Sequence, residues 1–429
     1  MRRVAKEYFP TLDLLAQSGL YDELVSKGLL IPHREITPDN AGGDRILQPE
    51  LIQSISYPYE WCFSQLKDAA LATLEVQRLA LEKGMSLKDA SAYNVQFHKG
   101  SPLVIDTLSF EVYDESSPWK AYRQFCEHFL APLSLMSFVD ARLNKLLRTF
   151  IDGVPLEIAS RMLPFRTRFS PGLSMHVHLH ARAQKSSGGA SGGAKAMFSK
   201  AAMLGLIDSL RGTTEKLEWK TPPTVWGDYY QNTNYSAEAM TQKKLLIAEL
   251  LGAISPKPSL VWDLGANTGE FSGLAAAQGM PTVAWDFDPA AVEQAYTANR
   301  KNPLVLPLMI DLTNPSPRLG WAHGERESFV DRCKADTVMA LALIHHLAIG
   351  NNVPLPMIAS FFASLSPWLL IEFVPKEDSQ VQRLMASRSD SFLGYTQDNF
   401  EQCFGELFAT AEKRPIEGTS RTLYVLKRR

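Results

Sequence analysis

Residues 261–272, VWDLGANTGEFS, place an acid at the end of an apolar run, followed by a turn bounded by glycines and then by the start of a helix. Gly265 and Gly269 permit backbone torsions and close contacts that a side chain would block. The helix that follows presents its free N–H groups at the same point. The segment therefore predicts a strand-to-helix turn through which a nucleotide approaches the edge of a sheet.

The chain beyond this turn alternates between apolar runs and helical patterns. Helices are expected from near Glu270 and over 289–300 and 357–364. Strands are expected over 260–265, 282–287, 305–310, 336–344 and 368–374, with a last strand near the sheet edge over 422–429. Continuously apolar strands that alternate with helices predict an α/β fold with a parallel sheet covered on both faces.

Two further acids stand where the second and third strands of this series end. Asp286 ends the second strand, and a carboxylate there can accept hydrogen bonds from both ribose hydroxyls of a nucleoside; Asp288 is the weaker candidate. Asp311 ends the third strand, where it can accept from an adenine amino group beside apolar contacts from Leu312. Three acids at three strand ends thus predict a nucleoside site.

This set of motifs resembles the class I S-adenosylmethionine-dependent methyltransferases, and the resemblance covers residues 261–429. It implies a Rossmann-like sheet of seven strands and S-adenosylmethionine as cofactor. By the resemblance, Asp286 would bind the ribose, and Asp311 and Leu312 would bind the adenine. The methionine part would be bound at the turn, by Asp263, Gly265, Ala266, Asn267 and Gly269. Asn267 and Thr268 stand where many members have a glycine.

Two alternatives use the same kind of turn, namely a dinucleotide-binding oxidoreductase and an α/β domain without a cofactor. The turn lacks the GxGxxG spacing that brings a helix N-terminus onto a pyrophosphate, and S-adenosylmethionine has no phosphate to hold. The spacing therefore favours the methyltransferase.

Methyl transfer from a sulfonium is an in-line displacement that orientation and exclusion of water can accelerate without a dedicated acid. A hydroxyl acceptor must lose a proton, and a histidine is the natural base. His345 and His346, after the fourth strand, are the first candidates, against roles as a strand cap and a loop contact. Glu372, at the end of the fifth strand, is the second, against a solvated carboxylate paired with Lys376.

An aromatic cluster precedes the first strand and consists of Trp226, Tyr229, Tyr230 and Tyr235. It would close the site or stack on an acceptor, or else pack the following helix against the sheet edge. The charges of 243–246, KKLL, are interpreted as ordinary solvated ones.

A stretch of glycine and serine, 185–195, predicts a flexible linker. It would divide a mainly helical accessory domain, 1–184, from the methyltransferase domain, 196–429. Before it, helical patterns cover 59–83 and 119–150, with one strand-turn-strand over 92–107.

The spacing of Asp89, Asn94 and Asp106 resembles the catalytic segment of protein-kinase-like folds. The resemblance implies a catalytic acid at Asp89 and metal ligands at Asn94 and Asp106. LKD replaces the usual HRD, and no glycine-rich loop precedes it. We therefore expect a degenerate lobe that recognises an acceptor or a partner protein, with an unrelated helical domain as the alternative.

Three histidines, His176, His178 and His180, would share one face of a strand, a geometry that could ligate zinc. No nearby Cys, Asp or Glu completes the set, so we expect no metal site.

The composition limits location and partners. The formal net charge is −2, which gives no bulk attraction to nucleic acid or an anionic membrane. Widely spaced cysteines and the lack of an apolar N-terminal segment predict a cytoplasmic protein with no membrane span. The absence of an NPPY-type motif favours oxygen or carbon of a small molecule or glycan as methyl acceptor. The alternative function is a non-catalytic scaffold that senses S-adenosylmethionine.

Overall fold

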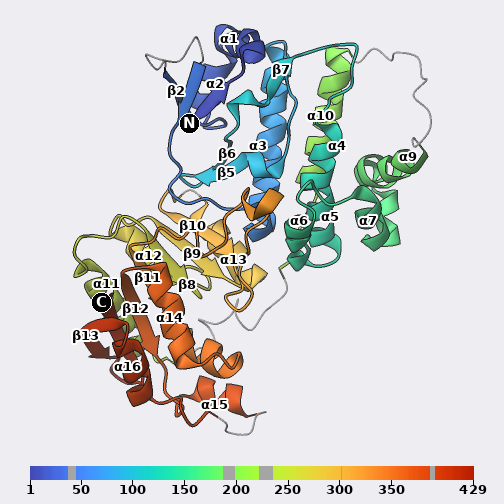
Figure 1. The fold of residues 1–429 in the computed structure, drawn as a ribbon. Coiled ribbons are helices and arrows are strands. Elements are labelled where there is room, and N and C mark those ends of the chain that lie inside the picture. The colour runs from blue at the N-terminus through green and yellow to red at the C-terminus, as the bar shows by residue number, and fades with distance from the viewer. Residues whose placement is uncertain (37–44, 187–198, 222–234, 301, 387–391) are drawn as a thin grey trace. The chain divides into compact units, whose positions relative to one another are not determined.

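The computed structural model describes residues 1–36, 45–186, 199–221, 235–300, 302–386 and 392–429. The chain divides into two compact units, Met1–Thr221 and Pro222–Arg429 (Figure 1). Within the described residues, no helix combines the length and the apolar character needed to cross a membrane.

The second unit contains the predicted sheet of seven strands. In sequence order the strands are β8 (Val261–Leu264), β9 (Thr282–Asp286), β10 (Val305–Met309), β11 (Thr337–Ala340), β12 (Trp368–Phe373), β13 (Phe408–Pro415) and β14 (Thr422–Arg428). In space the order is β10-β9-β8-β11-β12-β14-β13. The first five strands pair in parallel, whereas β14 runs antiparallel to both β12 and β13.

The apolar runs predicted six of the seven strands and placed the last of them near the sheet edge. Strand β14 lies second from the edge, and β13, which the sequence did not indicate, forms the edge itself. Most side chains of β13 are exposed, from Ala409 to Lys413 without interruption. A strand with little buried surface has no apolar run by which to recognise it.

The helices of the second unit connect the strands and cover the sheet (Figure 1). They are α11 (Ala237–Gly252), α12 (Glu270–Ala277), α13 (Pro289–Asn299), α14 (Leu355–Leu365), α15 (Ser379–Met385) and α16 (Gln397–Gly405). On one face, Leu251 of α11 and Phe271 of α12 share a buried cluster with Met339 and Leu370 of the central strands. Burial on both faces explains why these strands read as continuous apolar runs.

The order of strands creates a switch point beside β8. The chain steps from β8 to β9 and β10 in one direction and then returns to β11 on the other side of β8. Open α/β sheets bind ligands at the carboxyl ends of the strands where the order reverses in this way. The turn of 265–269 follows β8 and therefore lies at this point.

The first unit is built around the long helix α3 (Phe63–Glu82), which confirms the pattern seen over 59–83. Shorter helices occupy 122–149, and β5 (Val95–His98) and β6 (Ser101–Val104) form the predicted hairpin. The sequence did not reveal the sheet β1-β3-β2, formed by Arg2–Val4, Arg45–Pro49 and His33–Ile36, or the pair β4 (Met85–Leu87) and β7 (Phe110–Val112). These strands are only three to five residues long, too short for a clear alternation.

The boundary between the units differs from the predicted one. Helix α9 (His180–Ser186) includes the first two residues of the predicted linker, and 187–198 lie outside the described residues. Helix α10 (Lys200–Glu215), expected in the second domain, packs in the first unit, where Arg211 forms an ion pair of 2.5 Å with Glu75 of α3. Burial of its Ile207 and Leu210 holds it there, so the first unit extends to Thr221.

The three histidines of 176–180 do not share a strand face, because 174–179 form a π-helical turn, η8 (Ser174–Leu179). His176 bonds the hydroxyls of Tyr122 and Ser209, and the His180 ring stacks on Tyr122 at 4.9 Å. His178 bonds the hydroxyls of Ser160 and Thr167. Across the described part of the chain, no three or more His, Cys, Asp or Glu side chains are grouped to hold a metal ion.

The kinase-like residues lie near one another around the β5–β6 hairpin. Asn94 and Ile105 join its base through a 2.8 Å backbone hydrogen bond, and Asp106 accepts from Ser109 Oγ and pairs with Arg2. The Lys88 N–H, next to Asp89, donates to the carbonyl of Ser109. The kinase-like assignment of this unit stays a prediction.

Candidate active site

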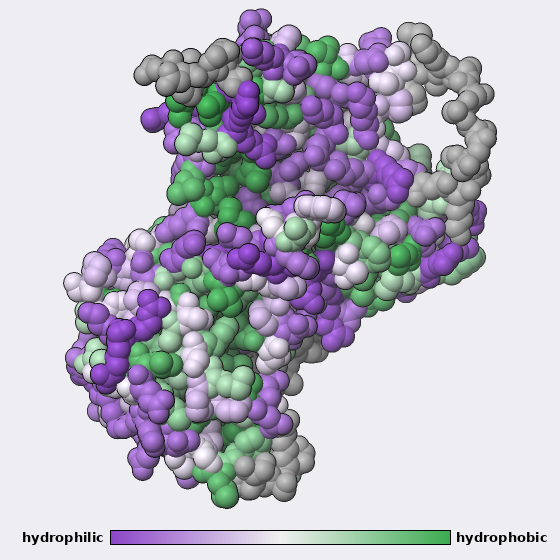
Figure 2. All heavy atoms as spheres, viewed as in Figure 1, coloured by the Kyte–Doolittle hydropathy of each residue, from purple (hydrophilic) through white to green (hydrophobic). Residues whose placement is uncertain are grey.

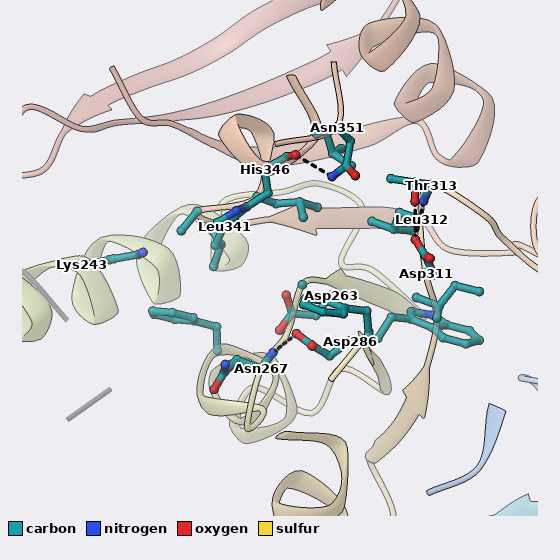
Figure 3. A pocket seen from close by; sticks show the side chains of 18 of the residues that line it. Lys243, Asp263, Asn267, Asp286, Asp311, Leu312, Thr313, Leu341, His346 and Asn351 are labelled. Atoms are coloured by element: carbon teal, nitrogen blue, oxygen red, sulfur yellow. Dashed lines mark hydrogen bonds between the residues drawn. The ribbon is translucent and has the colours of Figure 1, made fainter. Parts of the chain in front are cut away.

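A cavity of about 350 Å³ opens at the switch point of the seven-stranded sheet. Six of the predicted cofactor residues line it: Asp263, Gly265, Asn267, Asp286, Asp311 and Leu312. Ala266 and Gly269 do not line it, although both belong to the turn. In Figure 3, Lys243 lies at one end of this cavity and Asp311 at the other, with Asp263 and Asp286 between them and His346 facing them.

The glycine turn is fixed by its own hydrogen bonds. The N–H groups of Gly265 and Ala266 donate to the carbonyl of Trp285, that of Thr268 to Asn267 Oδ1, and that of Gly269 to the Ala266 carbonyl. The Asn267 N–H donates to Asp286 Oδ2 at 2.8 Å. Because every backbone N–H from 265 to 269 has a partner within the protein, the turn offers none of them to a phosphate.

Positive φ angles explain the residues of this turn. Gly265 has φ +77° and Gly269 has φ +82°, in the region that glycine alone visits freely. A side chain at Gly265 would also come within 3.3 Å of Leu343. Asn267 adopts φ +52°, and asparagine tolerates this region better than most residues. The departure from glycine at 267 therefore keeps the shape of the turn.

Two buried acids stand side by side at the floor of the cavity. Asp263 accepts a 2.6 Å hydrogen bond from Ser272 Oγ, and Asp286 accepts from the N–H groups of Asn267 and Asp288. Burial raises the pKa of Asp263 to about 7 and that of Asp286 to about 6. A cationic or hydrogen-bond-donating ligand beside them would therefore stabilise the ionised form of both carboxyls.

Asp311 occupies the far end, beyond β10. Its Oδ1 accepts from both the N–H and the hydroxyl of Thr313, at 2.9 and 2.6 Å. Both contacts use the same oxygen, so Oδ2 keeps its capacity to accept hydrogen bonds, and Asp311 lines the cavity together with Leu312.

The opposite end holds a buried ion network that the sequence analysis missed. Lys243 of α11, interpreted above as solvated, is 2% exposed and donates to Glu372 Oε2 at 2.6 Å and to the Tyr235 hydroxyl at 3.2 Å. Its ammonium also lies 4.9 Å from the centre of the Phe271 ring. Lys243, Tyr235 and Phe271 all line the cavity. The helical period, which places Lys243 with Ala239 and Ile247 on the buried face, could have signalled this.

Glu372 does not line the cavity and is not a solvated carboxylate paired with Lys376. It is fully buried, pairs with Lys243 and Arg421, and accepts a hydrogen bond from Tyr235. Burial alone would raise the pKa of Glu372, but the two cations outweigh burial and lower it to about 2. An acid of this kind stays ionised near neutral pH and holds cations in place.

Of the two candidate histidines, His346 lines the cavity and His345 does not. Their rings are 4.1 Å apart, and His345 is 2% exposed with no hydrogen-bond partner for Nδ1 in the described residues. Burial first, and then the Arg421 cation, lowers the pKa of His346 to about 4; that of His345 lies well below its ordinary value for similar reasons. Both rings are therefore neutral near pH 7.

The predicted aromatic cluster is represented by Tyr235, which lines the cavity and caps the ion network. Trp226, Tyr229 and Tyr230 lie outside the described residues.

Comparisons with solved structures found partial likenesses. N-methyltransferase NodS from Bradyrhizobium japonicum WM9 is 12% identical, with 45% of this chain and 98% of that chain covered and a TM-score of 0.33. Magnesium protoporphyrin IX methyltransferase from Synechocystis PCC 6803, with bound SAH, is 17% identical, with 48% and 93% covered and a TM-score of 0.34. The bifunctional kinase-methyltransferase WbdD is 16% identical, with 48% of this chain and 43% of that chain covered and a TM-score of 0.31. At such scores these likenesses say nothing about activity.

Comparison at the level of sequence gives the family. No profile of a known protein family matches the chain. Nodulation protein NoeA of Rhizobium meliloti (strain 1021) is 37% identical over 419 residues, which cover 95% of this chain and 88% of that protein. An identity of this level over nearly the whole length shows common descent, and the chain belongs to the family of nodulation protein NoeA.

Proposed function

We propose that the second unit binds S-adenosylmethionine in the cavity at the switch point and transfers its methyl group to an acceptor. The observation that carries the proposal is the arrangement of charge along the cavity, with acids at the ends of β8, β9 and β10 and the cation Lys243 at the end remote from Asp311.

The nucleoside would lie at the end formed by Asp286 and Asp311. The oxygens of Asp286 accept backbone N–H groups, among them those of Asn267 and Asp288, and a carboxylate has about four acceptor positions, so acceptor capacity is left for a ribose hydroxyl. Asp311 Oδ2 can accept from an amino group beside the apolar Leu312. This donor and acceptor chemistry fits adenosine.

The amino-acid part would lie between Asp263 and Lys243. Lys243 offsets only part of the effect of burial on Asp263, and an ammonium group beside Asp263 would add a second cation. A carboxylate beside Lys243 would accept its third N–H. Opposite protein charges at this end thus suit a zwitterion. The internally bonded turn gives no support to a pyrophosphate, and so none to the dinucleotide alternative.

When bound, S-adenosylmethionine supplies an electrophilic methyl group on a sulfonium. His346 is the one predicted catalytic residue that lines the cavity, and its neutral ring can accept a hydrogen bond from an acceptor hydroxyl and orient it. We assign Glu372 and His345 to positioning, because Glu372 fixes Lys243 and His345 packs behind His346. Leu341, Leu343 and Leu347 would exclude water around the methyl group.

For the acceptor we propose oxygen or carbon of a small molecule or glycan. A hydroxyl suits His346, whose low pKa makes it a hydrogen-bond acceptor rather than a cation. For the first unit we propose a degenerate kinase-like lobe that binds the acceptor or a partner protein. The ion pair of Asp106 with Arg2 supports this, since the pair occupies a carboxylate that a metal on ATP phosphates would need.

Calorimetric titration tests the proposed cofactor. The protein should bind S-adenosylmethionine and S-adenosylhomocysteine but not NAD, and Asp286→Ala should weaken both about 100-fold, because hydrogen bonds to a charged group are lost. Asp288→Ala, which removes the neighbouring acid and cap of α13, is the matched control and should keep most of the affinity. A folded protein that binds neither compound would refute the proposal. Binding without transfer to any hydroxylated acceptor would favour the sensing scaffold.

A further inference from the structure

The first unit carries an exposed surface that the cavity chemistry does not use. It is formed by α7 (Leu156–Met162), the 3-10 turn η7 (Phe165–Phe169) and η8. We call it the arginine–phenylalanine surface and define it by Arg161, Phe165, Arg166, Arg168, Phe169, Met175 and Leu179. Phe169 is 75% exposed, Phe165 67%, Leu179 52% and Met175 47%. Figure 2 shows hydrophobic and hydrophilic residues intermixed in the region of α7.

The charge of this surface comes mainly from arginines, although Glu157 at the start of α7 is also exposed. From Ile158 to Ala183 the sequence has four arginines and no aspartate or glutamate. Arg161, Arg166 and Arg168 are exposed, and none of them takes part in an ion pair within the described residues. The net charge of −2 for the whole chain therefore hides a strongly basic patch.

Cations and rings alternate across this patch. The guanidinium of Arg168 lies 5.2 Å above the Phe165 ring, and the Phe165 and Phe169 rings are 5.5 Å apart, edge to face. Arg166 lies 5.8 Å above the ring of Phe138, whose neighbour Val139 is 47% exposed. The result is an apolar layer with positive groups distributed through it.

The histidine motif of 176–180 has a structural role beneath this surface. His178 is buried and bonds Ser160 of α7 at 2.8 Å and Thr167 of η7 at 2.9 Å, so one side chain joins all three elements. Met175 and Leu179, one helical turn apart on η8, remain outside. The apolar side chains are thus exposed on a fixed frame, which would be costly in water without a partner.

We propose that the arginine–phenylalanine surface docks the first unit onto an anionic lipid bilayer. Apolar side chains would enter the boundary between headgroups and acyl chains, while the arginines would bind lipid phosphates. Guanidinium groups suit phosphates because they can donate two parallel hydrogen bonds. The aliphatic Met175 and Leu179 favour lipid over single-stranded nucleic acid, because they give no stacking platform for bases.

Cosedimentation of the full chain with vesicles tests the docking. The protein should bind vesicles that contain phosphatidylglycerol and should not bind vesicles of phosphatidylcholine alone. Added salt should weaken the binding. Arg166→Glu with Arg168→Glu should lower affinity at least about 25-fold, since each arginine contributes about fivefold. The control is Lys6→Glu with Arg34→Glu, an equal charge change on exposed residues of the same unit, which should change it little.

A second pair of variants tests the apolar part. Phe165→Ser with Phe169→Ser should abolish the binding that persists at high salt, whereas Trp321→Ser, at an 85% exposed residue of the second unit, should not. Equal binding by all variants, or none by the wild type, would overturn the proposal. The proposal would also be overturned if single-stranded DNA displaced the protein from vesicles and the phenylalanine variants bound vesicles as well as the wild type does. Self-association that the phenylalanine variants abolish, without vesicle binding, would identify a second copy as the occupant instead.

Discussion

The two ends of the cavity are charged in opposite senses, and they are built in different ways. At the nucleoside end, Asp286 is the last residue of β9 and Asp311 lies two residues after β10, and both bond to backbone groups within a few residues or on the adjacent turn. At the amino-acid end, Lys243 pairs with Glu372, which also pairs with Arg421, and these two residues are 129 and 178 positions further along the chain. The first end is therefore encoded locally, whereas the second exists only once the sheet is complete.

The largest difference between the ends should be in stability. Glu372→Gln would leave the buried cations Lys243 and Arg421 without the acid between them, and we expect the free energy of unfolding to fall by about 3–5 kcal/mol. Asp311→Asn, at the other end, keeps an oxygen for Thr313 and should cost less than about 1 kcal/mol. Urea unfolding, with amide exchange read at β12 and β14, measures both changes.

Glu377→Gln, an exposed acid close to β12 in sequence, is the control and should have no measurable effect. If Glu372→Gln and Asp311→Asn lowered the free energy of unfolding equally, the ion network would be no more important to the fold than Asp311.

The same contrast explains what the sequence could predict. Asp263, Asp286 and Asp311 were found because each stands at the end of an apolar run, a signal contained within a dozen residues. Lys243 was misread because it stands next to Lys244, which is half-exposed, and only the helical period distinguishes the buried lysine from its neighbour. Glu372 was named as a candidate, but its partners come from α11 and from Arg421, the residue before β14, rather than from Lys376. The strands themselves could be predicted from the sequence where they are apolar, but not at β13, whose side chains are mostly exposed.

Lys243→Met should weaken the binding of a ligand that has the amino-acid part and leave unchanged the binding of a ligand that lacks it. S-adenosylhomocysteine keeps the amino-acid part and should bind about 10- to 100-fold more weakly, because a charge-assisted hydrogen bond is lost. Methylthioadenosine lacks that part and should bind as it does to the wild type. Calorimetry of both ligands with both proteins gives the comparison. Equal weakening of the two ligands would place Lys243 at the nucleoside instead, or reveal damage to the whole cavity.

The smallest expected effect is a dependence on pH, and it arises midway between the two ends. Burial raises the pKa of Asp263 from 3.8 to about 7, so the folded protein without ligand holds a proton that the unfolded chain releases above about pH 4. The folded state therefore binds more protons in this window, and the free energy of unfolding contributed by Asp263 falls as pH rises toward 7. A ligand ammonium favours the ionised carboxylate, so binding of S-adenosylhomocysteine should release a proton and tighten several-fold between pH 6 and 8. Calorimetry in buffers of different ionisation enthalpy counts that proton. Asp263→Asn should remove the part of this pH dependence that comes from Asp263 and leave only the part that comes from Asp286, whose pKa is about 6. A wild type whose affinity does not change with pH would mean that the ammonium lies elsewhere.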